Sequence, residues 1–440
     1  MRSLASKAAA AATRSTQSTL STRSTEIMRR SPVFFLSVLV IQFLIGLYIF
    51  WGLASMVQRP ISKYGLWLFF ILEELIIFWG LNVMKEKMSG QLIHTMAWQN
   101  ILIGVAFAFI VAKFVLVFFF LLDDVFRVGS FASTKLMNAS DVVNLKGRRS
   151  FIINTGVLLA GIPFVSLIYG TLKGRYNYQL KRLSVRFRDL PKGLKGLKII
   201  QLSDIHAGNI DNPSSLRKAI DIINAQKPDL ILFTGDLVNR DAREIEPFID
   251  VFKELKAKYG KYSILGNHDY VEYKQWESLA QKDENQELLY QFHGDMGFQL
   301  LRNEHAVVQV KGDELYLLGV ENWGMPPFPQ HGDLDKTLKG VPKDAIKILL
   351  SHDPTHWDQK VIGHDKHIHL TLSGHTHGAQ VGIDTRWLKW SPVQFVYKRW
   401  SGLYEEANQF LYVNRGFGVL AFPGRVGMWP EITLIEILDV

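Results

Sequence analysis

The stretch ILGNHDY, residues 264–270, decides how the rest of the chain is interpreted. An apolar run that ends at Gly266 predicts a buried strand followed by a sharp turn. Asn267, His268 and Asp269 then lie at the carboxyl end of that strand, where open α/β sheets bind their ligands. Asn267 offers a neutral oxygen, the His268 imidazole can donate a proton or bind an anion, and the Asp269 carboxylate can orient that imidazole.

Short apolar runs alternate with amphipathic segments on both sides of this stretch. The predicted strands cover residues 196–202, 230–234, 262–265, 305–310, 315–320, 346–350, 367–372, 411–414 and 432–438. The predicted helices cover residues 216–225, 248–258 and 272–291. The alternation predicts an α/β domain.

Length and composition divide the chain into two parts. It has 440 residues, which is too long for a single typical hydrophobic core, and its composition changes near residue 180. The absence of cysteine excludes disulfides, thiolate metal sites and cysteine nucleophiles, so any metal is held by His, Asp, Glu or Asn. The net charge of +9 is spread along the chain, which favours attraction to anionic lipid over nucleic-acid binding.

The first part contains apolar segments long enough to cross a hydrocarbon layer of about 30 Å. They lie near residues 33–54, 65–83, 101–122 and 151–170. Lys113 and either Glu73 or Glu74 lie within these segments, where charges are costly, so we predict that they form an intramembrane ion pair. We interpret this pair as structural rather than as part of an ion path. We therefore expect an integral membrane protein with about four transmembrane helices, in a bacterial cell membrane.

Flanking charges set the expected domain boundaries and leave two orientations open. We expect a disordered basic leader over residues 1–30, rather than an organelle transit peptide, and a transmembrane region over 31–172. A basic connector over 173–195 and a second domain over 196–440 follow. Arg29 and Arg30 favour a cytoplasmic second domain. Arg148 and Arg149 favour the opposite side and resemble a twin-arginine export signal.

Four further predicted strands end in residues that can bind metals. These residues are Asp204 and His206, Asp236, His352, and His375 and His377. Side chains two positions apart in a strand face the same side, so Asp204 with His206, or His375 with His377, could meet a common centre. With Asn267 and His268, five strand ends carry such residues, which coincidence explains poorly.

The ordered blocks DIH (204–206), GD (235–236), GNHD (266–269), SH (351–352) and GHTH (374–377) resemble the calcineurin-like metallophosphoesterase superfamily. The resemblance covers residues 197–438. The longer blocks GDLVN, GHTHGAQ and NRGFG are similar to the membrane-associated bacterial branch that includes the YkuE-like phosphoesterases. Ala379 departs from the glycine common in relatives and alters a loop without removing a ligand.

The resemblance implies a four-layer α/β/β/α sandwich with a dinuclear metal centre. It assigns one metal to Asp204, His206 and His377, the other to Asn267, His352 and His375, and the bridging position to Asp236. It places His268 at the phosphoryl oxygens or the leaving group, with Asp269 orienting it. The imidazole and oxygen ligands suit Mn, Fe or Zn, and two such metals clamp the attacking and leaving oxygens of a phosphoryl displacement.

Two further groups are candidates for substrate contact. Arg415 and Arg425 lie in glycine-rich stretches and could receive a phosphate, or form salt bridges instead. A dense aromatic group could pack in the core or form an apolar rim that faces lipid or a substrate acyl chain. The group consists of Trp323, Trp387, Trp390, Tyr397, Trp400 and Tyr404.

The sequence therefore predicts a membrane-anchored phosphoesterase that hydrolyses a phosphodiester, phosphomonoester or pyrophosphate bond. A tethered domain meets membrane-surface substrates at high effective concentration, so we expect a lipid-linked or envelope substrate. The alternatives are a nucleotide phosphodiesterase or a protein phosphatase and, outside enzymes, a membrane sensor that retains the fold. A transporter is disfavoured because the sequence shows no internal repeat.

Overall fold

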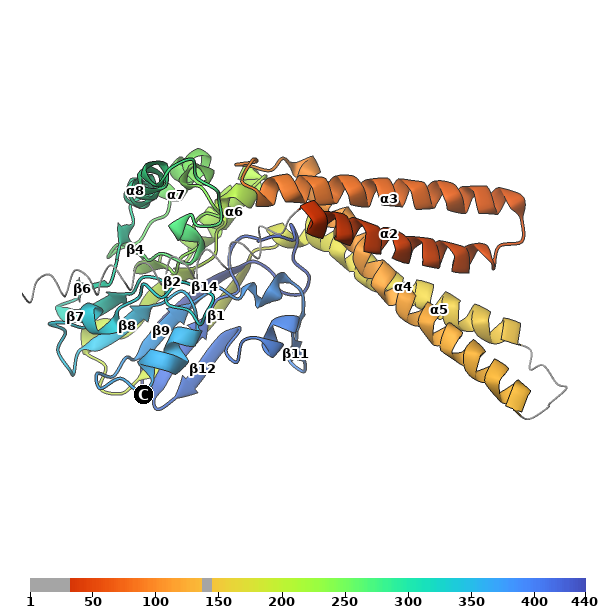
Figure 1. Cartoon of the computed structure of the whole chain (residues 1–440). Helices are drawn as coiled ribbons and strands as arrows, with labels where there is room; N and C mark the ends of the chain where they lie inside the picture. Colours follow the sequence, from red (N-terminus) through yellow and green to blue (C-terminus); the bar gives the residue numbers. More distant parts are fainter. Residues whose placement is uncertain (1–31, 137–144) are drawn as a thin grey trace, which may run out of the picture.

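The structure is a computed structural model that describes residues 32–136 and 145–440. The predicted leader, with Arg29 and Arg30, lies outside the described residues. Figure 1 shows a group of long helices attached to one side of an α/β domain. These two parts correspond to the change of composition near residue 180.

Four helices of the first part are long and apolar enough to cross a membrane. They are α2 (Pro32–Ala54), α3 (Pro60–Met88), α4 (Ala97–Leu136) and α5 (Leu145–Leu172). The four predicted segments are confirmed, and α3, α4 and α5 continue beyond them into flanking residues. In Figure 1 the α2–α3 and α4–α5 pairs start together at the α/β domain and diverge toward their far ends.

The predicted intramembrane ion pair joins α3 and α4. Lys113 Nζ lies 2.6 Å from Glu74 Oε1 and 3.3 Å from Glu73 Oε1, and it donates to Gln42 Oε1 at 2.9 Å. The Lys113 cation of α4 thus contacts two carboxylates of α3 and one amide of α2. Charges are expensive inside a membrane, so this cluster fixes how the helices pack.

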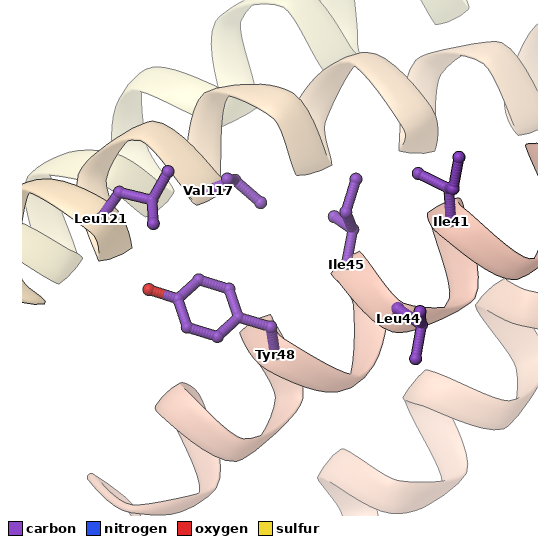
Figure 2. Close-up of a pocket in the computed structure, with 6 residues that line it drawn as sticks. All are labelled: Ile41, Leu44, Ile45, Tyr48, Val117 and Leu121. Atoms are coloured by element: carbon purple, nitrogen blue, oxygen red, sulfur yellow. The ribbon is translucent and has the colours of Figure 1, made fainter.

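An apolar hollow of about 330 Å³ lies between α2 and α4 (Figure 2). Its lining consists of Ile41, Leu44, Ile45, Tyr48, Val117 and Leu121. The Tyr48 hydroxyl donates to Asp124 Oδ2 at 2.6 Å. None of the predicted site residues lines this hollow, so the predicted chemistry lies in the other part of the molecule.

The α/β domain contains two six-stranded sheets. The first has the order β1 (Gln179–Phe187), β14 (Glu431–Asp439), β2 (Leu197–Leu202), β3 (Leu230–Phe233), β4 (Lys261–Ser263) and β5 (Gln299–Leu300). The second has the order β12 (Gly402–Glu406), β13 (Gln409–Val413), β9 (Leu370–Ser373), β8 (Ile346–Leu350), β7 (Asp313–Gly319) and β6 (Glu304–Val310). A small hairpin pairs β10 (Ile383–Asp384) with β11 (Lys389–Trp390).

The sheets pack face to face and helices cover their outer faces. The core between the sheets includes Ile199, Leu232, Ile348 and Leu372. The helices α6 (Pro213–Ala225), α7 (Ile249–Lys253) and α8 (Leu279–Asp295) accompany the first sheet, and α9 (Leu334–Thr337) accompanies the second. The predicted four-layer α/β/β/α sandwich is confirmed. Helix α7 is shorter than the predicted 248–258 segment.

The predicted connector 173–195 is wrong in part, because it contains strand β1. This strand pairs in parallel with β14 from Gln179–Glu431 to Phe187–Asp439. Val185 and Phe187 are buried, but basic residues between the apolar ones hide the period of two in the sequence. The true link between α5 and the sheet is residues 173–178, and it spans at most roughly 20 Å when fully extended.

The strand directions decide which edge of the first sheet faces the membrane helices. Strand β1 is parallel to β14, and β14 is antiparallel to β2, with Thr433 opposite Gln201. The first residue of β1 therefore lies at the same edge as the last residue of β2. Since α5 leads directly into β1, the carboxyl end of β2 lies on the membrane side of the domain.

Candidate metal centre

The loops that follow β2, β3, β4, β8 and β9 bring the predicted metal ligands together at this edge. Each of two groups of three residues offers ligand atoms that all lie within 4.8 Å of one another. One group consists of Asp204, His206 and His377, and the other of Asp236, His352 and His375. Sequence positions as far apart as 204 and 377 thus meet at one site.

The first group is fully enclosed by protein. His206 Nε2 lies 2.9 Å from His377 Nε2, which lies 3.2 Å from Asp204 Oδ1. All three residues are buried. Two imidazoles and a carboxylate that converge on one point form a donor set that fits a divalent cation.

The second group includes Asn267 and meets the first through Asp236. His375 Nδ1 lies 2.8 Å from Asn267 Oδ1 and 3.3 Å from His352 Nε2. Asp236 Oδ2 lies 3.2 Å from His352 Nε2 and 3.6 Å from His206 Nε2. The Asp236 carboxylate therefore stands between the two groups, as a bridging ligand would. The individual ligand assignments stay predictions.

The ligand-bearing turns have unusual backbone conformations. Asp204, His206, Asp236, His375 and His377 all have positive φ, between 48° and 70°. Left-handed backbone costs a non-glycine residue about 1–3 kcal/mol and clusters at functional sites. Of the two pairs predicted to share a centre, Asp204 and His206 do belong to one group, whereas His375 and His377 belong to different groups. Extended strand geometry does not explain either arrangement, because β2 and β9 end before these residues.

Gly235 shows why a glycine precedes Asp236. Its φ is +91°, and an added Cβ would lie 2.4 Å from the backbone nitrogen of Gly266. Only glycine allows the loops after β3 and β4 to approach this closely. The close approach places Asp236 next to Asn267.

His268 borders the centre, but Asp269 does not orient it. His268 Nδ1 lies 2.9 Å from the carbonyl oxygen of Asn239. A carbonyl only accepts, so Nδ1 carries the proton and Nε2 is left for the substrate. The His268 ring stacks on Tyr273, with 4.3 Å between ring centres. Burial lowers the pKa of His268, against the opposing effect of the Asp236 carboxylate.

Asp269 fixes the loops instead. Its carboxylate accepts hydrogen bonds at 2.8–3.2 Å from four backbone N–H groups. The donors belong to Asp236, Leu237, Val238 and Gly266. The predicted role of Asp269 is therefore wrong: the carboxylate satisfies the strained turns around Asp236, and a backbone carbonyl holds the imidazole.

Further side chains that sequence reasoning did not assign to the site hold its ligands. The Tyr397 hydroxyl lies 2.8 Å from His375 Nε2, and Asp353 Oδ2 lies 3.5 Å from the same nitrogen. Asn267 Nδ2 donates to the Tyr273 hydroxyl at 2.9 Å, which turns Oδ1 toward His375. Asp353 directly follows the SH block and offered a signal, whereas nothing in the sequence marked Tyr273. Such contacts orient ligands and tune metal sites.

The predicted substrate role of Arg415 and Arg425 is wrong. Arg425 is fully buried and donates to the carbonyl oxygens of Arg415 and Gly418 at 2.8 and 2.7 Å. Arg415 pairs with Asp384 at 2.6 Å and with Glu431 at 3.5 Å. Glycine-rich loops leave buried carbonyl groups that need donors, and the Arg425 guanidinium supplies them, whereas Arg415 forms salt bridges, which were the predicted alternative.

The membrane part contacts the loop that follows His206. The backbone N–H of Thr95, between α3 and α4, donates to the carbonyl oxygen of Gly208 at 3.4 Å. Asp211 accepts from Asn100 Nδ2 at 2.7 Å and pairs with Arg175 Nη2 at 2.8 Å. The predicted metal edge is thus attached to the helices at two separate places along the chain.

Comparisons with known proteins define the class to which this fold and site belong. Residues 197–379 match the profile of the family described as "Calcineurin-like phosphoesterase". Residues 28–175 match "Probable Calcineurin-like phosphoesterase, transmembrane domain". The chain carries the two domains of a membrane-bound metallophosphoesterase.

Individual relatives agree with this class. Over 301 residues the chain is 31% identical to "Uncharacterized metallophosphoesterase YkuE" of Bacillus subtilis, a match that covers 66% of this chain and 97% of the relative. Over 287 residues the chain is 29% identical to "Transmembrane protein with metallophosphoesterase domain" of Danio rerio. This match covers 63% of this chain and 62% of that relative's length. The chain belongs to the calcineurin-like metallophosphoesterase family and is an integral membrane phosphoesterase. The family and the His and Asp groups indicate divalent metal ions.

Proposed function

We propose that this enzyme uses two divalent metal ions to hydrolyse a phosphodiester, phosphomonoester or pyrophosphate bond of a lipid-linked or envelope substrate. One observation carries the substrate class: the edge with the predicted ligands is the edge at which α5 enters the sheet and Thr95 contacts the Gly208 loop. A phosphate group in the plane of a leaflet is close to such an edge. A tethered site meets it at high effective concentration.

The proposed ligand sets follow the two groups of side chains. Asp204, His206 and His377 would hold one ion, Asn267, His352 and His375 the other, and Asp236 would bridge them. Imidazole and oxygen donors suit Mn, Fe or Zn. When bound, such ions polarise a phosphoryl group and supply a nucleophile at neutral pH.

The chain's own residues would then act on the phosphoryl group. The Asn239 carbonyl holds the proton on His268 Nδ1, so Nε2 is the atom that would face the substrate. Once Nε2 has taken up a proton from the attacking water, it would donate to the phosphoryl oxygens or pass that proton to the leaving group. The Tyr397 hydroxyl and the Asp353 carboxylate would hold the ring of His375 in place. The Asp269 carboxylate keeps the turn around Asp236 closed.

The test uses the full-length protein in lipid nanodiscs with Mn²⁺ or with a chelator. The substrates are a phospholipid phosphomonoester, a polyprenyl pyrophosphate and a nucleotide. Two chromogenic compounds, p-nitrophenyl phosphate and bis-p-nitrophenyl phosphate, are tested beside them. We expect metal-dependent turnover on a membrane substrate, its loss in Asp236→Asn, and a decrease of about 10²–10⁴-fold in His268→Ala. Asp250→Asn, at an exposed carboxylate, is the matched control.

Each contrary outcome contradicts a different part of the proposal. Turnover of nucleotides with none of any membrane substrate would refute the substrate class and favour the nucleotide phosphodiesterase alternative. Equal turnover with Mn²⁺ and with chelator would refute the metal mechanism. A folded protein that binds Mn²⁺ but hydrolyses none of the substrates would favour the sensor alternative.

A further inference from the structure

The segment of residues 383–396 exposes large apolar side chains. It consists of the β10–β11 hairpin and the turn that follows it. The exposed fractions are 87% for Trp387, 80% for Phe395 and 77% for Val396, and Leu388 is also exposed. Contiguous exposed apolar side chains of this kind mark a surface that binds a protein, a ligand or a membrane.

This segment adjoins the membrane helices. Val381, two residues before β10, packs in one apolar cluster with Ala108 of α4, Leu167 of α5 and Phe422. Ala108 and Leu167 both lie within the helical segments that can span a membrane. In Figure 1 strand β11 lies on the side of the α/β domain that faces α4 and α5. The exposed side chains therefore continue a surface that already contacts the membrane spans.

The charges around the segment match a bilayer surface. Residues 381–400 contain four basic residues and one acidic residue, and two of the basic ones, Lys398 and Arg399, pair with acidic residues outside this range. The acidic residue, Asp384, is paired internally with Arg415. The Arg386 guanidinium lies over the Trp387 ring at 5.2 Å. Tryptophan with nearby cations is typical of the headgroup region, where the ring is buried and the cation meets lipid phosphates.

The same segment leads into the predicted metal centre. Tyr397 directly follows Val396, and its hydroxyl lies 2.8 Å from His375 Nε2. A surface that holds Phe395 and Val396 in lipid would hold the wall of the centre at the membrane interface. The exposed apolar residues and the site wall are thus neighbours along one short stretch of chain.

We propose that residues 383–396 dock on the bilayer. Trp387, Phe395 and Val396 enter the boundary between headgroups and acyl chains, and Arg386 meets lipid phosphate. The occupant of this surface is the bilayer in which the same chain's helices lie. One consequence rests on the proposed function: the docked segment would border the path by which a lipid-linked phosphate enters the centre.

The absence of native cysteine permits a direct test. Single cysteines replace Trp387 and Val396 in the full-length protein, each labelled with an environment-sensitive fluorophore in nanodiscs that contain anionic lipid. Leu279→Cys at the start of α8 is the matched control, because its exposed fraction of 80% lies between the 77% of Val396 and the 87% of Trp387. We expect a shift to shorter wavelength at residues 387 and 396 and loss of emission with headgroup-level spin-labelled lipid. We expect neither effect at residue 279.

Two outcomes would overturn the docking proposal. One is a solvent-like emission at residues 387 and 396, equal to that at 279. The other is a shifted emission that spin-labelled lipid does not quench, which would indicate a protein contact. The labels report docking without turnover, so shielded labels on an enzyme inactive toward membrane substrates would contradict only the proposed function.

Discussion

Asp211→Asn should weaken the attachment between the metal edge and the membrane helices. The Asp211 and Arg175 side chains are only 2% and 4% exposed, and their atoms Oδ2 and Nη2 lie 2.8 Å apart. Asn100 and the Tyr176 hydroxyl also donate to this carboxylate. The substitution removes the charge that balances a buried guanidinium and places an amide among three donors.

The structure sets the size of this effect. Removing one partner from a buried ion pair costs about 3–5 kcal/mol, because the remaining charge stays buried without compensation. Asparagine keeps one acceptor oxygen, which can still accept from either Asn100 or Tyr176, so we expect the lower end, about 3 kcal/mol. At roughly 2–4 °C per kcal/mol for a domain of this size, the unfolding midpoint should fall by roughly 6–12 °C.

The assay is thermal unfolding of the full-length protein in one detergent, followed by turnover in nanodiscs. Asp221→Asn is the matched control, because Asp221 is an exposed carboxylate on α6, close to Asp211 in the chain. A midpoint for Asp211→Asn within 1–2 °C of this control would refute the reasoning, since solvent would then compensate Arg175. Turnover of membrane substrates should fall more than turnover of p-nitrophenyl phosphate if the attachment aims the centre at the leaflet.

Three further predictions concern other buried groups. Lys113→Met leaves Glu73 and Glu74 without a cation, so the free energy of unfolding measured in detergent should fall by about 3–5 kcal/mol. If adding Glu74→Gln to this variant recovers no stability, the explanation is contradicted. Asp269→Asn replaces an acceptor of four backbone N–H groups, so the free energy of unfolding should fall by about 1–3 kcal/mol in denaturation experiments. Calorimetry should also show weaker Mn²⁺ binding. Wild-type values in both measurements would contradict the role of Asp269 in fixing the loops. Burial lowers the pKa of His293 to about 3, so its neutral form stabilises the fold above the unfolded pKa of about 6.5 and that stability is lost as the pH falls. Between pH 7.5 and 5.5 this loss is about 1.4 kcal/mol, and His293→Gln should flatten the measured pH dependence by that amount; an unchanged slope would contradict it.

The sequence predicted the features that depend on residue type and period. Strands β8 and β2 are mainly apolar and end two residues before His352 and Asp204, so both the element and the site position could be inferred. Strand β1 could not, because its outward residues are basic and its burial begins only at Val185. The basic composition of residues 173–195 therefore led us to predict a connector where the structure has strand β1.

The errors at the site arise where a role depends on three-dimensional contacts. Asp269 follows His268 in the sequence, which suggested that it orients the imidazole, yet its oxygens accept from backbone N–H groups of the Asp236 loop and of Gly266. Arg415 and Arg425 are basic residues in glycine-rich loops, a pattern equally typical of phosphate sites and of buried loop supports. Only their burial and their partners, which are backbone carbonyls for Arg425 and carboxylates for Arg415, distinguish the two.

The two attachments between the parts restrict the direction from which substrate can reach the centre. A single flexible link would let the catalytic domain rotate about one point. Here the short link 173–178 leads into β1 and also contacts Asp211 through Arg175 and Tyr176, while Asn100 donates to the same carboxylate and Thr95 contacts Gly208 of the same loop. The Val381 cluster with Leu167 adds a contact between the α/β domain and α5 at another place in the chain. These contacts restrict rotation of the domain about the short link, which supports the proposal that the helices keep the predicted metal edge toward the membrane.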